Sequence, residues 1–334
     1  MNRLSFLALA LLASTACAAP TQYMLEKKFA LPGDGGWDCI SVDSASHRLF
    51  ISRGTHVQVM DVNTGQMVGD IPNTQGVHAI ATVDRLGKGY ITCGRDDSLL
   101  VFDLATLKET KRIKVGGRPD VIYFDQGTNR VFSFNAGSSD ATAVDVDTDK
   151  VVGTVKLSGK PEFAISDGRG TIWVNLEDKS AIERFDARKL TTMGTWPLAP
   201  AEEPTGLGLD TRDHLLFSAC ANEMMAITDL RTGKVVATPK IGKGPDGAAF
   251  DNGMAFSPNG QDGTLSVLAK QDGTWAPVQT VTTQRGARTM AVDSRTHKIY
   301  LIAAQYEIPA SGTAGRPRMI PGSATILVVS PVKR

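Results

Sequence analysis

The stretch RPDVIYFDQGTNRVFSFNAGSSDATAVDVDTDKVVGTVKL, residues 118–157, decides the fold of this chain. It contains four short runs that suit β-strands, at residues 121–124, 130–134, 141–146 and 151–157. Apolar, β-branched and aromatic residues dominate these runs. Turn-forming glycine, asparagine and aspartate residues separate them. Four short strands joined by tight turns predict one antiparallel sheet.

The same pattern recurs seven times between Gly35 and Pro331, with a period of about 42 residues. Each copy begins with a small or basic residue, often followed by proline, and then a polar residue that we call position zero. The spacings between successive position-zero residues are 40, 42, 42, 43, 41 and 42. The position-zero residues are Asp38, His78, Asp120, Glu162, Thr205, Asp246 and Arg288. Such a repeat is typical of the blades of a β-propeller.

Two more positions recur within the repeat. Aspartate follows position zero by five residues in six copies, at Asp43, Asp125, Asp167, Asp210, Asp251 and Asp293, and slips to Asp84 in the second copy. An aromatic residue follows by twelve in five copies, at Phe50, Tyr90, Phe132, Phe217 and Tyr300. No helical periodicity accompanies them, which excludes an α/β fold. The sequence therefore predicts an all-β, seven-bladed β-propeller with four antiparallel strands per blade.

The sixth and seventh copies depart from the pattern. The sixth has Phe256 early and a longer outer region through Trp275. The seventh supplies only three strands, while an unmatched strand-like run, Tyr23 to Leu31, precedes the first copy. We expect this run to dock on the last blade and close the ring, because an open seam would leave exposed strand edges. Residues 20–334 are thus expected to form a single propeller domain.

Residues 1–19 have the pattern of a secretory signal peptide. Arg3 precedes the apolar stretch Leu4 to Ala13, and small residues lead to a cleavage position near Ala18 or Ala19. The stretch is too short for a membrane span. Cys17 offers the alternative of lipid anchoring, although Ser14 stands where such signals normally have leucine. We expect a periplasmic or secreted monomer with no transmembrane span in the mature protein.

The charge balance limits the partners. The chain has 36 Lys+Arg and 35 Asp+Glu, and loss of Arg3 with the signal segment leaves 35 of each. A neutral protein has no overall field to attract polyanions, and 6% aromatic residues offer few surfaces for base stacking, so nucleic acid is a disfavoured partner. A local basic patch remains open, with candidates Arg53, Arg95, Arg118, Lys160, Arg285, Arg288, Arg316 and Arg318.

Cysteine and histidine positions follow from the repeat. Cys39 and Cys93 fall on the same face of adjacent blades, which permits a disulfide, and the alternative is that both are small buried residues. No Cys-x-x-Cys-His motif occurs, so covalent haem is not expected. His47, His214 and His297 all follow position zero by nine residues and are expected in structural turns. His56 and His78 map to the opposite face.

The position-zero residues are the candidate binding site. They begin the inner strands, so they are expected to surround the mouth of the central channel. A concentration of titratable groups there favours a pocket for a polar ligand or a divalent cation, with carboxylates as oxygen ligands and His78 as ligand or general base. The alternative is that the aspartates only accept backbone N–H groups at the strand starts. The candidate ligand-binding residues are Asp38, His78, Asp120, Glu162, Asp246, Arg288 and Tyr306.

Tyr306 enters this set from a long loop in the seventh copy. Between Gln305 and Ser323 the chain is much longer than the corresponding loops of the other copies. Its place in the repeat puts it on the same face as position zero. Long loops of this kind are often lids or binding loops, and the alternative is a solvated Pro/Gly loop. The loop's candidate binding side chains are Tyr306, Glu307, Arg316 and Arg318.

The repeats resemble those of the YncE-like, YVTN-type seven-bladed propellers. Residues 131–135, Val-Phe-Ser-Phe-Asn, match that family's Val-Tyr-Val-Thr-Asn strand in type, and residues 140–148 match its third-strand signature. Residues 285–293 resemble a hallmark of a subgroup. The resemblance covers the mature chain and implies a secreted or periplasmic propeller. Related propellers include redox enzymes, lactonases, lyases and binding proteins, so the resemblance does not assign an activity.

Three function classes follow. The first is a non-catalytic binding protein of the cell envelope that recognises a partner protein or small polar ligand on the channel face. The second is a metal-dependent enzyme of the lactonase or lyase type, with ring carboxylates and His78 around a divalent cation. The third, single-stranded nucleic-acid binding, has little support from charge and aromatic content.

Overall fold

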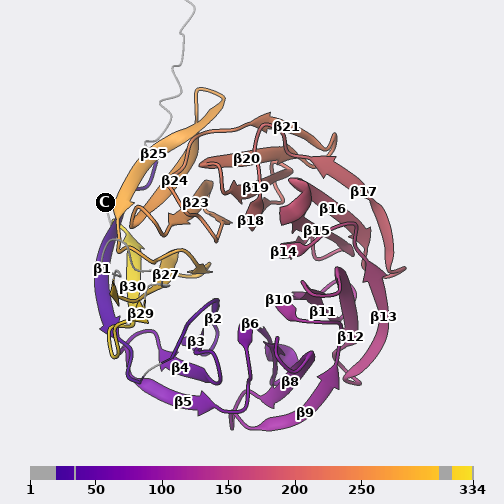
Figure 1. Ribbon diagram of the computed structural model, residues 1–334. Helices are drawn as coiled ribbons and strands as arrows, with labels where there is room; N and C mark the ends of the chain where they lie inside the picture. The colour runs from indigo at the N-terminus through magenta and orange to yellow at the C-terminus, as the bar shows by residue number, and fades with distance from the viewer. Residues whose placement is uncertain (1–19, 34, 308–317, 333–334) are drawn as a thin grey trace, which may run out of the picture.

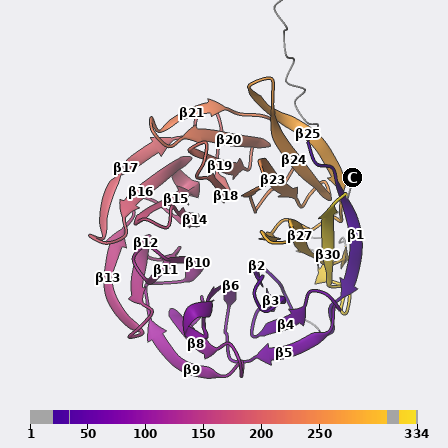
Figure 2. The same cartoon turned by 180° about the vertical axis from the view of Figure 1, so that it is seen from behind.

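The computed structural model describes residues 20–33, 35–307 and 318–332. Seven four-stranded antiparallel sheets stand around a central axis, and the chain passes through them in sequence order (Figure 1). Figure 2 shows the same closed ring from behind. The prediction of an all-β, seven-bladed propeller is confirmed. The predicted signal segment, residues 1–19, and Arg316 lie outside the described residues.

Every blade runs outward from its inner strand. Blade 1 contains β2 (Ile40–Asp43), β3 (Arg48–Ser52), β4 (Val57–Asp61) and β5 (Met67–Ile71). Blade 2 contains β6 (Val77–Val83), β7 (Lys88–Cys93), β8 (Ser98–Asp103) and β9 (Glu109–Lys114). Blade 3 contains β10 (Pro119–Asp125), β11 (Arg130–Asn135), β12 (Asp140–Asp145) and β13 (Lys150–Lys156). Blade 4 contains β14 (Pro161–Ser166), β15 (Thr171–Leu176), β16 (Ala181–Asp186) and β17 (Thr191–Pro197). Blade 5 contains β18 (Pro204–Asp210), β19 (Leu215–Cys220), β20 (Met224–Asp229) and β21 (Lys234–Ala237). In the described part of the chain, two single turns of 3₁₀ helix, Asp84–Leu86 and Glu177–Lys179, interrupt connections in blades 2 and 4.

The sixth blade differs from the others, as the sequence indicated. It contains β22 (Ala249–Asp251), β23 (Met254–Asn259), β24 (Thr264–Gln271) and β25 (Thr274–Thr282). Its inner hairpin turns through two residues only, Asn252 and Gly253, both with positive φ. Its outer hairpin is long, because β24 and β25 pair as far as Gln271 and Thr274.

The seventh blade is completed by the N-terminal strand. Its sheet has the order β1 (Tyr23–Ala30), β30 (Thr325–Pro331), β27 (Lys298–Ala303) and β26 (Met290–Asp293). β1 pairs antiparallel with β30 from Tyr23↔Pro331 to Ala30↔Thr325. The predicted closure by the run Tyr23 to Leu31 is therefore confirmed, and it leaves no open seam between the first and last copies (Figure 1).

The recurring residues hold the blades in place. The five aromatic residues twelve positions after position zero are at most 2% exposed, and they pack within the apolar clusters between neighbouring blades. The recurring aspartates cap turns, as where the Asp43 carboxylate accepts the backbone N–H groups of Ala45 and Ser46. The predicted turn histidines are confirmed, since His47, His214 and His297 have φ of 56°, 59° and 57°. Left-handed backbone of this kind is enriched in asparagine, aspartate and histidine.

The three cysteines of the described residues are reduced and buried. Cys39, Cys93 and Cys220 are all free thiols, so the disulfide that the sequence permitted between Cys39 and Cys93 is not formed. Cys39 packs with Ala79 and Ile122, whereas Cys93 packs with Phe50 and Ile91 in another apolar cluster. Within the described residues, no helix has the length and apolar character that a membrane crossing requires.

Candidate functional site

Backbone irregularities at position zero set the direction of the side chains in the site. In blades 2 to 5 the pairing of the first two strands shifts register around this residue, between Val77 and Ile80 in blade 2 and between Pro119 and Ile122 in blade 3. A bulge redirects the side chain that it contains. In blades 1, 6 and 7 the inner strand begins only after position zero. The position-zero side chain therefore does not follow the alternation of side chains between the two faces of the sheet.

Neighbouring blades fix the backbone of these residues. The Thr92 hydroxyl donates to the Asp120 carbonyl at 2.7 Å, and the Thr289 hydroxyl donates to the Asp38 carbonyl at 2.8 Å. The Cys39 N–H donates to the His78 carbonyl at 3.2 Å. Each bond joins one blade to the next near the axis. The backbone is thus held without using the position-zero side chains.

The carboxylates of Asp38, Asp120, Glu162 and Asp246 do not cap strand starts. Within the described residues, their hydrogen bonds and ion pairs go to side chains only, and none accepts a backbone N–H. The alternative that these carboxylates only accept backbone N–H groups at the strand starts is therefore wrong. This differs from four of the recurring aspartates five residues later, Asp43, Asp167, Asp210 and Asp293, which do accept turn amides.

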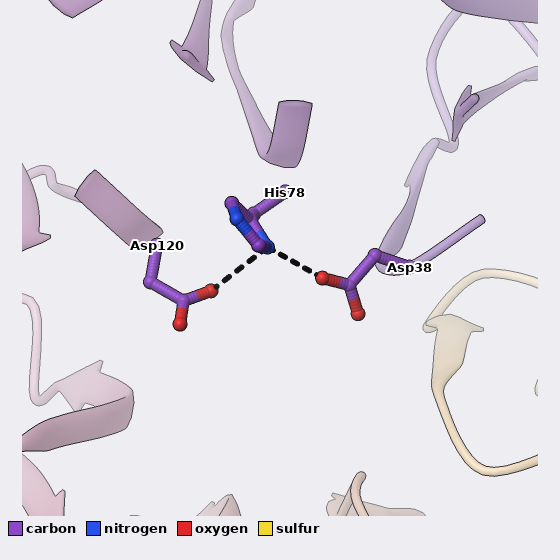
Figure 3. Close-up of side chains that lie close together, drawn as sticks. All are labelled: Asp38, His78 and Asp120. Carbon is purple, nitrogen blue, oxygen red and sulfur yellow. Dashed lines mark hydrogen bonds and ion pairs between the residues drawn. The ribbon is translucent and has the colours of Figure 1, made fainter. Parts of the chain in front are cut away.

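Asp38, His78 and Asp120 meet at the axis from three successive blades. The His78 Nδ1 lies 2.6 Å from Asp38 Oδ2 and 3.4 Å from Asp120 Oδ1. Figure 3 shows the imidazole between the two carboxyl groups, with the three side chains directed toward one another. The hydrogen bond to Asp38 raises the pKa of His78, against an opposing effect of burial and with further support from Asp120.

Asp246 and Arg288 extend this chain of contacts across the closure of the ring. Arg288 Nε donates to Asp246 Oδ2 at 2.7 Å, and its Nη2 lies 3.8 Å from Asp38 Oδ1. The guanidinium also stacks on Trp37, 4.9 Å from the ring centroid. Charges of alternating sign therefore follow one another from blade 6 through blades 7, 1 and 2 to blade 3 when His78 is protonated.

Glu162 lies beside this chain of contacts, in blade 4. Lys160 Nζ lies 2.9 Å from Glu162 Oε1 and also bonds Glu177. Burial, together with the Asp120 and Glu177 carboxylates, raises the pKa of Glu162 to about 7 despite the contact with Lys160. Thr205, the position-zero residue of blade 5, directs its hydroxyl to the backbone carbonyl of Ala219 at 3.3 Å. Blade 5 therefore contributes no charge.

The resulting group of side chains is partly exposed to solvent and crowded with negative charge. Exposed fractions run from 12% for Glu162 to 44% for Arg288. Burial and the neighbouring carboxylates raise the pKa of Asp246 to about 6, although Arg288 opposes the shift. Burial is also the main reason that the pKa of Asp120 is raised. We call this group the axial site: Asp38, His78, Asp120, Glu162, Asp246 and Arg288.

Tyr306 lies at the edge of the axial site. It belongs to the short strand β28 (Tyr306–Glu307), which pairs with β29 (Arg318–Met319) at the ends of the long loop. A Cβ atom at Gly286 would lie 3.8 Å from its ring, two residues from Arg288. The predicted placement of Tyr306 on the axial face is therefore consistent with the fold. His56, by contrast, pairs with Asp70 at 3.5 Å, outside the axial site.

Three of these side chains have the geometry of a metal-binding group. One ligand atom each from Asp38, His78 and Asp120 lies within 4.8 Å of the others. Two carboxylate oxygens and one imidazole nitrogen suit a divalent cation that accepts oxygen and nitrogen ligands. The remaining candidates, Glu162, Asp246, Arg288 and Tyr306, do not join this group of three.

Sequence reasoning identified the charged residues but missed their order and two of their partners. The contacts between Arg288 and both aspartates depend on the curvature that brings blades 6, 7 and 1 together. Trp37 directly precedes position zero of blade 1 and was not recognised as the surface under Arg288. Lys160 appeared only as a basic-patch candidate, although its position two residues before Glu162 was a usable signal.

Comparison with known proteins adds no family assignment. No protein-family model matches this chain, and no curated protein matches it either. The chain is therefore placed by its structure, as a seven-bladed β-propeller with a charged axial site.

Proposed function

We propose that this protein is a binding protein whose axial site holds a small polar cation. The observation that carries the proposal is the set of four converging carboxylates that accept no backbone N–H in the described part of the chain. Their permanent positive neighbours are Arg288, Lys160 and Arg118, and Lys160 is shared with Glu177. With the four carboxylates ionised and His78 neutral, the site therefore carries an excess of negative charge.

The energetics favour a cationic ligand. Partial burial and the nearness of other carboxylates raise the free energy of an ionised carboxyl group, and this is why the pKa values of Asp120, Glu162 and Asp246 are raised. A cation among them offsets both burial and mutual repulsion. An anion would instead compete with Asp38 and Asp246 for Arg288.

A metal-dependent enzyme of the lactonase or lyase type is the second candidate. The specific observation in its favour is the group Asp38, His78 and Asp120, whose ligand atoms lie within 4.8 Å of one another. A divalent cation there would supply Lewis-acid chemistry. The same three residues would hold it, and Glu162, with its pKa raised to about 7, is a candidate for a general base.

The resemblance to YncE-like propellers supports a place in this group, and the pattern of residues 1–19 supports secretion or a periplasmic location. Both statements are proposals that rest on sequence. They suit a protein that captures a small ligand outside the cytoplasm. Purification of the mature protein from a cell-envelope or culture fraction tests the location.

Calorimetric titration distinguishes the two candidates. The probes are Mn²⁺ and 1,4-diaminobutane, added to the wild type, Asp120→Asn and the control Asp147→Asn, which changes an exposed aspartate in a turn of the same blade. Saturable binding of either cation that Asp120→Asn weakens about tenfold or more, and that Asp147→Asn leaves unchanged, supports the axial site. Binding of Mn²⁺ alone favours the enzyme, and binding of neither cation contradicts both candidates.

A further inference from the structure

A cavity lies between blades 5 and 6, on the face opposite the axial site. Its volume is about 530 Å³, within the range of small-molecule sites. Turn residues form it: those between β18 and β19, those between β20 and β21, and those around the β24–β25 hairpin. In a four-stranded antiparallel blade these turns share one face. The strand starts that carry the axial site occupy the other face.

The irregular sixth blade creates this cavity. In blade 3 the inner turn runs from Asp125 to Arg130, whereas in blade 6 it runs only from Asp251 to Met254. The outer hairpin is extended instead, and it ends in a two-residue turn at Asp272 and Gly273 with φ of 47° and 83°. A shorter inner turn beside a longer outer hairpin leaves space against blade 5. The departure seen in the sequence thus builds a cavity.

An aromatic group supports the apolar wall of the cavity. Trp275 is only 8% exposed and packs edge-on against Phe217, with ring centroids 4.9 Å apart. Phe217 in turn stacks on Phe250 at 5.1 Å. Leu215 and Val236 complete the wall, and Val236 is 55% exposed. An exposed valine beside a fixed indole offers a surface to an apolar ligand.

The polar side of the cavity is cationic. Arg212, Arg231 and Lys270 line it together with two carboxylates. Asp229 is occupied by Arg231 and by the backbone N–H groups of its own turn, which lower its pKa to about 2. Arg212 has a 92% exposed side chain and only a 3.7 Å contact with Asp213. Lys270 makes no ion pair with the described residues.

We propose that this cavity binds a small organic anion with a flat apolar body, such as an aromatic carboxylate. The apolar body would rest mainly on Val236, beside Trp275, and the carboxylate would face Lys270 and Arg212. An aromatic carboxylate matches both halves of the lining, since the ring replaces water on the wall while the charge meets the unpaired ammonium. This site is independent of the proposed cation site.

Titration with 1-naphthoate tests the proposal, and neutral 1-naphthamide is the matched ligand. The test variants are Lys270→Gln and Val236→Glu. The control is Val68→Glu, because Val68 is a 51% exposed outer-strand valine of blade 1. We expect saturable 1-naphthoate binding that is about tenfold tighter than 1-naphthamide binding, weakened about fivefold by Lys270→Gln and about tenfold by Val236→Glu. Val68→Glu should bind like the wild type.

Three results would overturn this assignment. The first is the absence of saturable 1-naphthoate binding up to about 10 mM, which is weaker than a specific site would be. The second is equal binding of the acid and the amide, which would remove the role of the cationic side. The third is wild-type affinity in Val236→Glu, which would place any bound naphthoate elsewhere on the protein.

Discussion

His78 is the residue that connects the carboxylates of the axial site across the first three blades. Its Nδ1 lies within 3.4 Å of carboxylates from two other blades. The protonated imidazole attracts both Asp38 and Asp120, whereas a neutral imidazole that carries its proton on Nδ1 keeps the hydrogen bond to Asp38 and loses the charge attraction to both carboxylates. The charge of His78 therefore sets how strongly the first three blades are connected at the axis.

Asp38→Asn should lower the pKa of His78, because the hydrogen bond from Asp38 is the largest cause of its raised value. The imidazole proton resonances report this pKa in an NMR titration. His297 is the internal control, since its partner is Asp251, at 2.6 Å, on the other face of the ring. An unchanged His78 titration in Asp38→Asn would contradict the contact.

Glu162→Gln should reduce the pH dependence of stability. The pKa of Glu162 is raised to about 7 in the fold, so the protonated form contributes stability at low pH that is lost as the pH rises through 7. The free energy of unfolding should therefore fall less between pH 5 and 8 in Glu162→Gln than in the wild type, by about 1–3 kcal/mol. Chemical denaturation measures it.

Glu202→Gln is the control for this change, because Glu202 is exposed on a loop and its carboxylate makes no hydrogen bond or ion pair with the described residues. It should follow the wild-type profile. In Glu162→Gln, Lys160 keeps its contact with Glu177, so no unpaired cation is created. Equal pH dependence in the wild type and Glu162→Gln would mean that Glu162 ionises normally.

At the level of elements, β1 completes the ring. Tyr23 is 2% exposed and packs edge-on against Phe256 at 5.1 Å, and its backbone N–H and carbonyl both bond the side chain of Gln279. One residue of the N-terminal strand thus connects blade 7 to the outer strand of blade 6.

Tyr23→Ala should destabilise the protein by about 3–5 kcal/mol, the range for removing a large buried aromatic side chain. The control is Met24→Ala, whose side chain is 53% exposed and which should change stability by about 0.5 kcal/mol or less. Thermal and denaturant unfolding measure both. Similar losses from the two variants would show that β1 does not depend on the Tyr23 contacts.

The elements also show where sequence patterns lose information. The repeat predicted the strands of blade 3 within about two residues, because each turn carries its own aspartate, glycine or asparagine. It did not reveal the bulges at position zero, since a bulge depends on the partner strand. In blade 6 the sequence showed only that the residues depart from the repeat pattern, and it did not show the short inner turn or the long outer hairpin. The cavity that these two features form also requires residues of blade 5, which the pattern of one blade does not contain.

At the level of the whole molecule, the fold was predictable and the connections at the site were not. Seven repeats and one unmatched strand specify a closed ring, because each copy must bury its faces against two neighbours. Six of the seven position-zero residues make up the axial site, and Thr205 does not join them. The pairing of Arg288 with Asp246 and Asp38 depends on side-chain directions across the closure, which a linear repeat does not contain.

The affinity of the axial site for a cation should increase with pH. The pKa values of Asp246 and Glu162 are raised to about 6 and about 7, so both carboxyl groups are largely protonated at pH 5 and ionised at pH 8. Calorimetry at pH 5, 6, 7 and 8 with the better of the two cations measures the trend. Affinity that is constant over this range would contradict a role for these two carboxylates.

Native mass spectrometry of the mature protein, purified without chelator, tests the central claim most directly, because one spectrum reveals a metal or an organic cation alike. The comparison is with the double variant Asp120→Asn, Asp246→Asn, which keeps the size of both side chains and removes two of the four axial carboxylates. We predict a stoichiometric cation adduct on the wild type that the double variant loses. Adduct-free spectra of both proteins, or the same adduct on both, would contradict a cation-binding axial site.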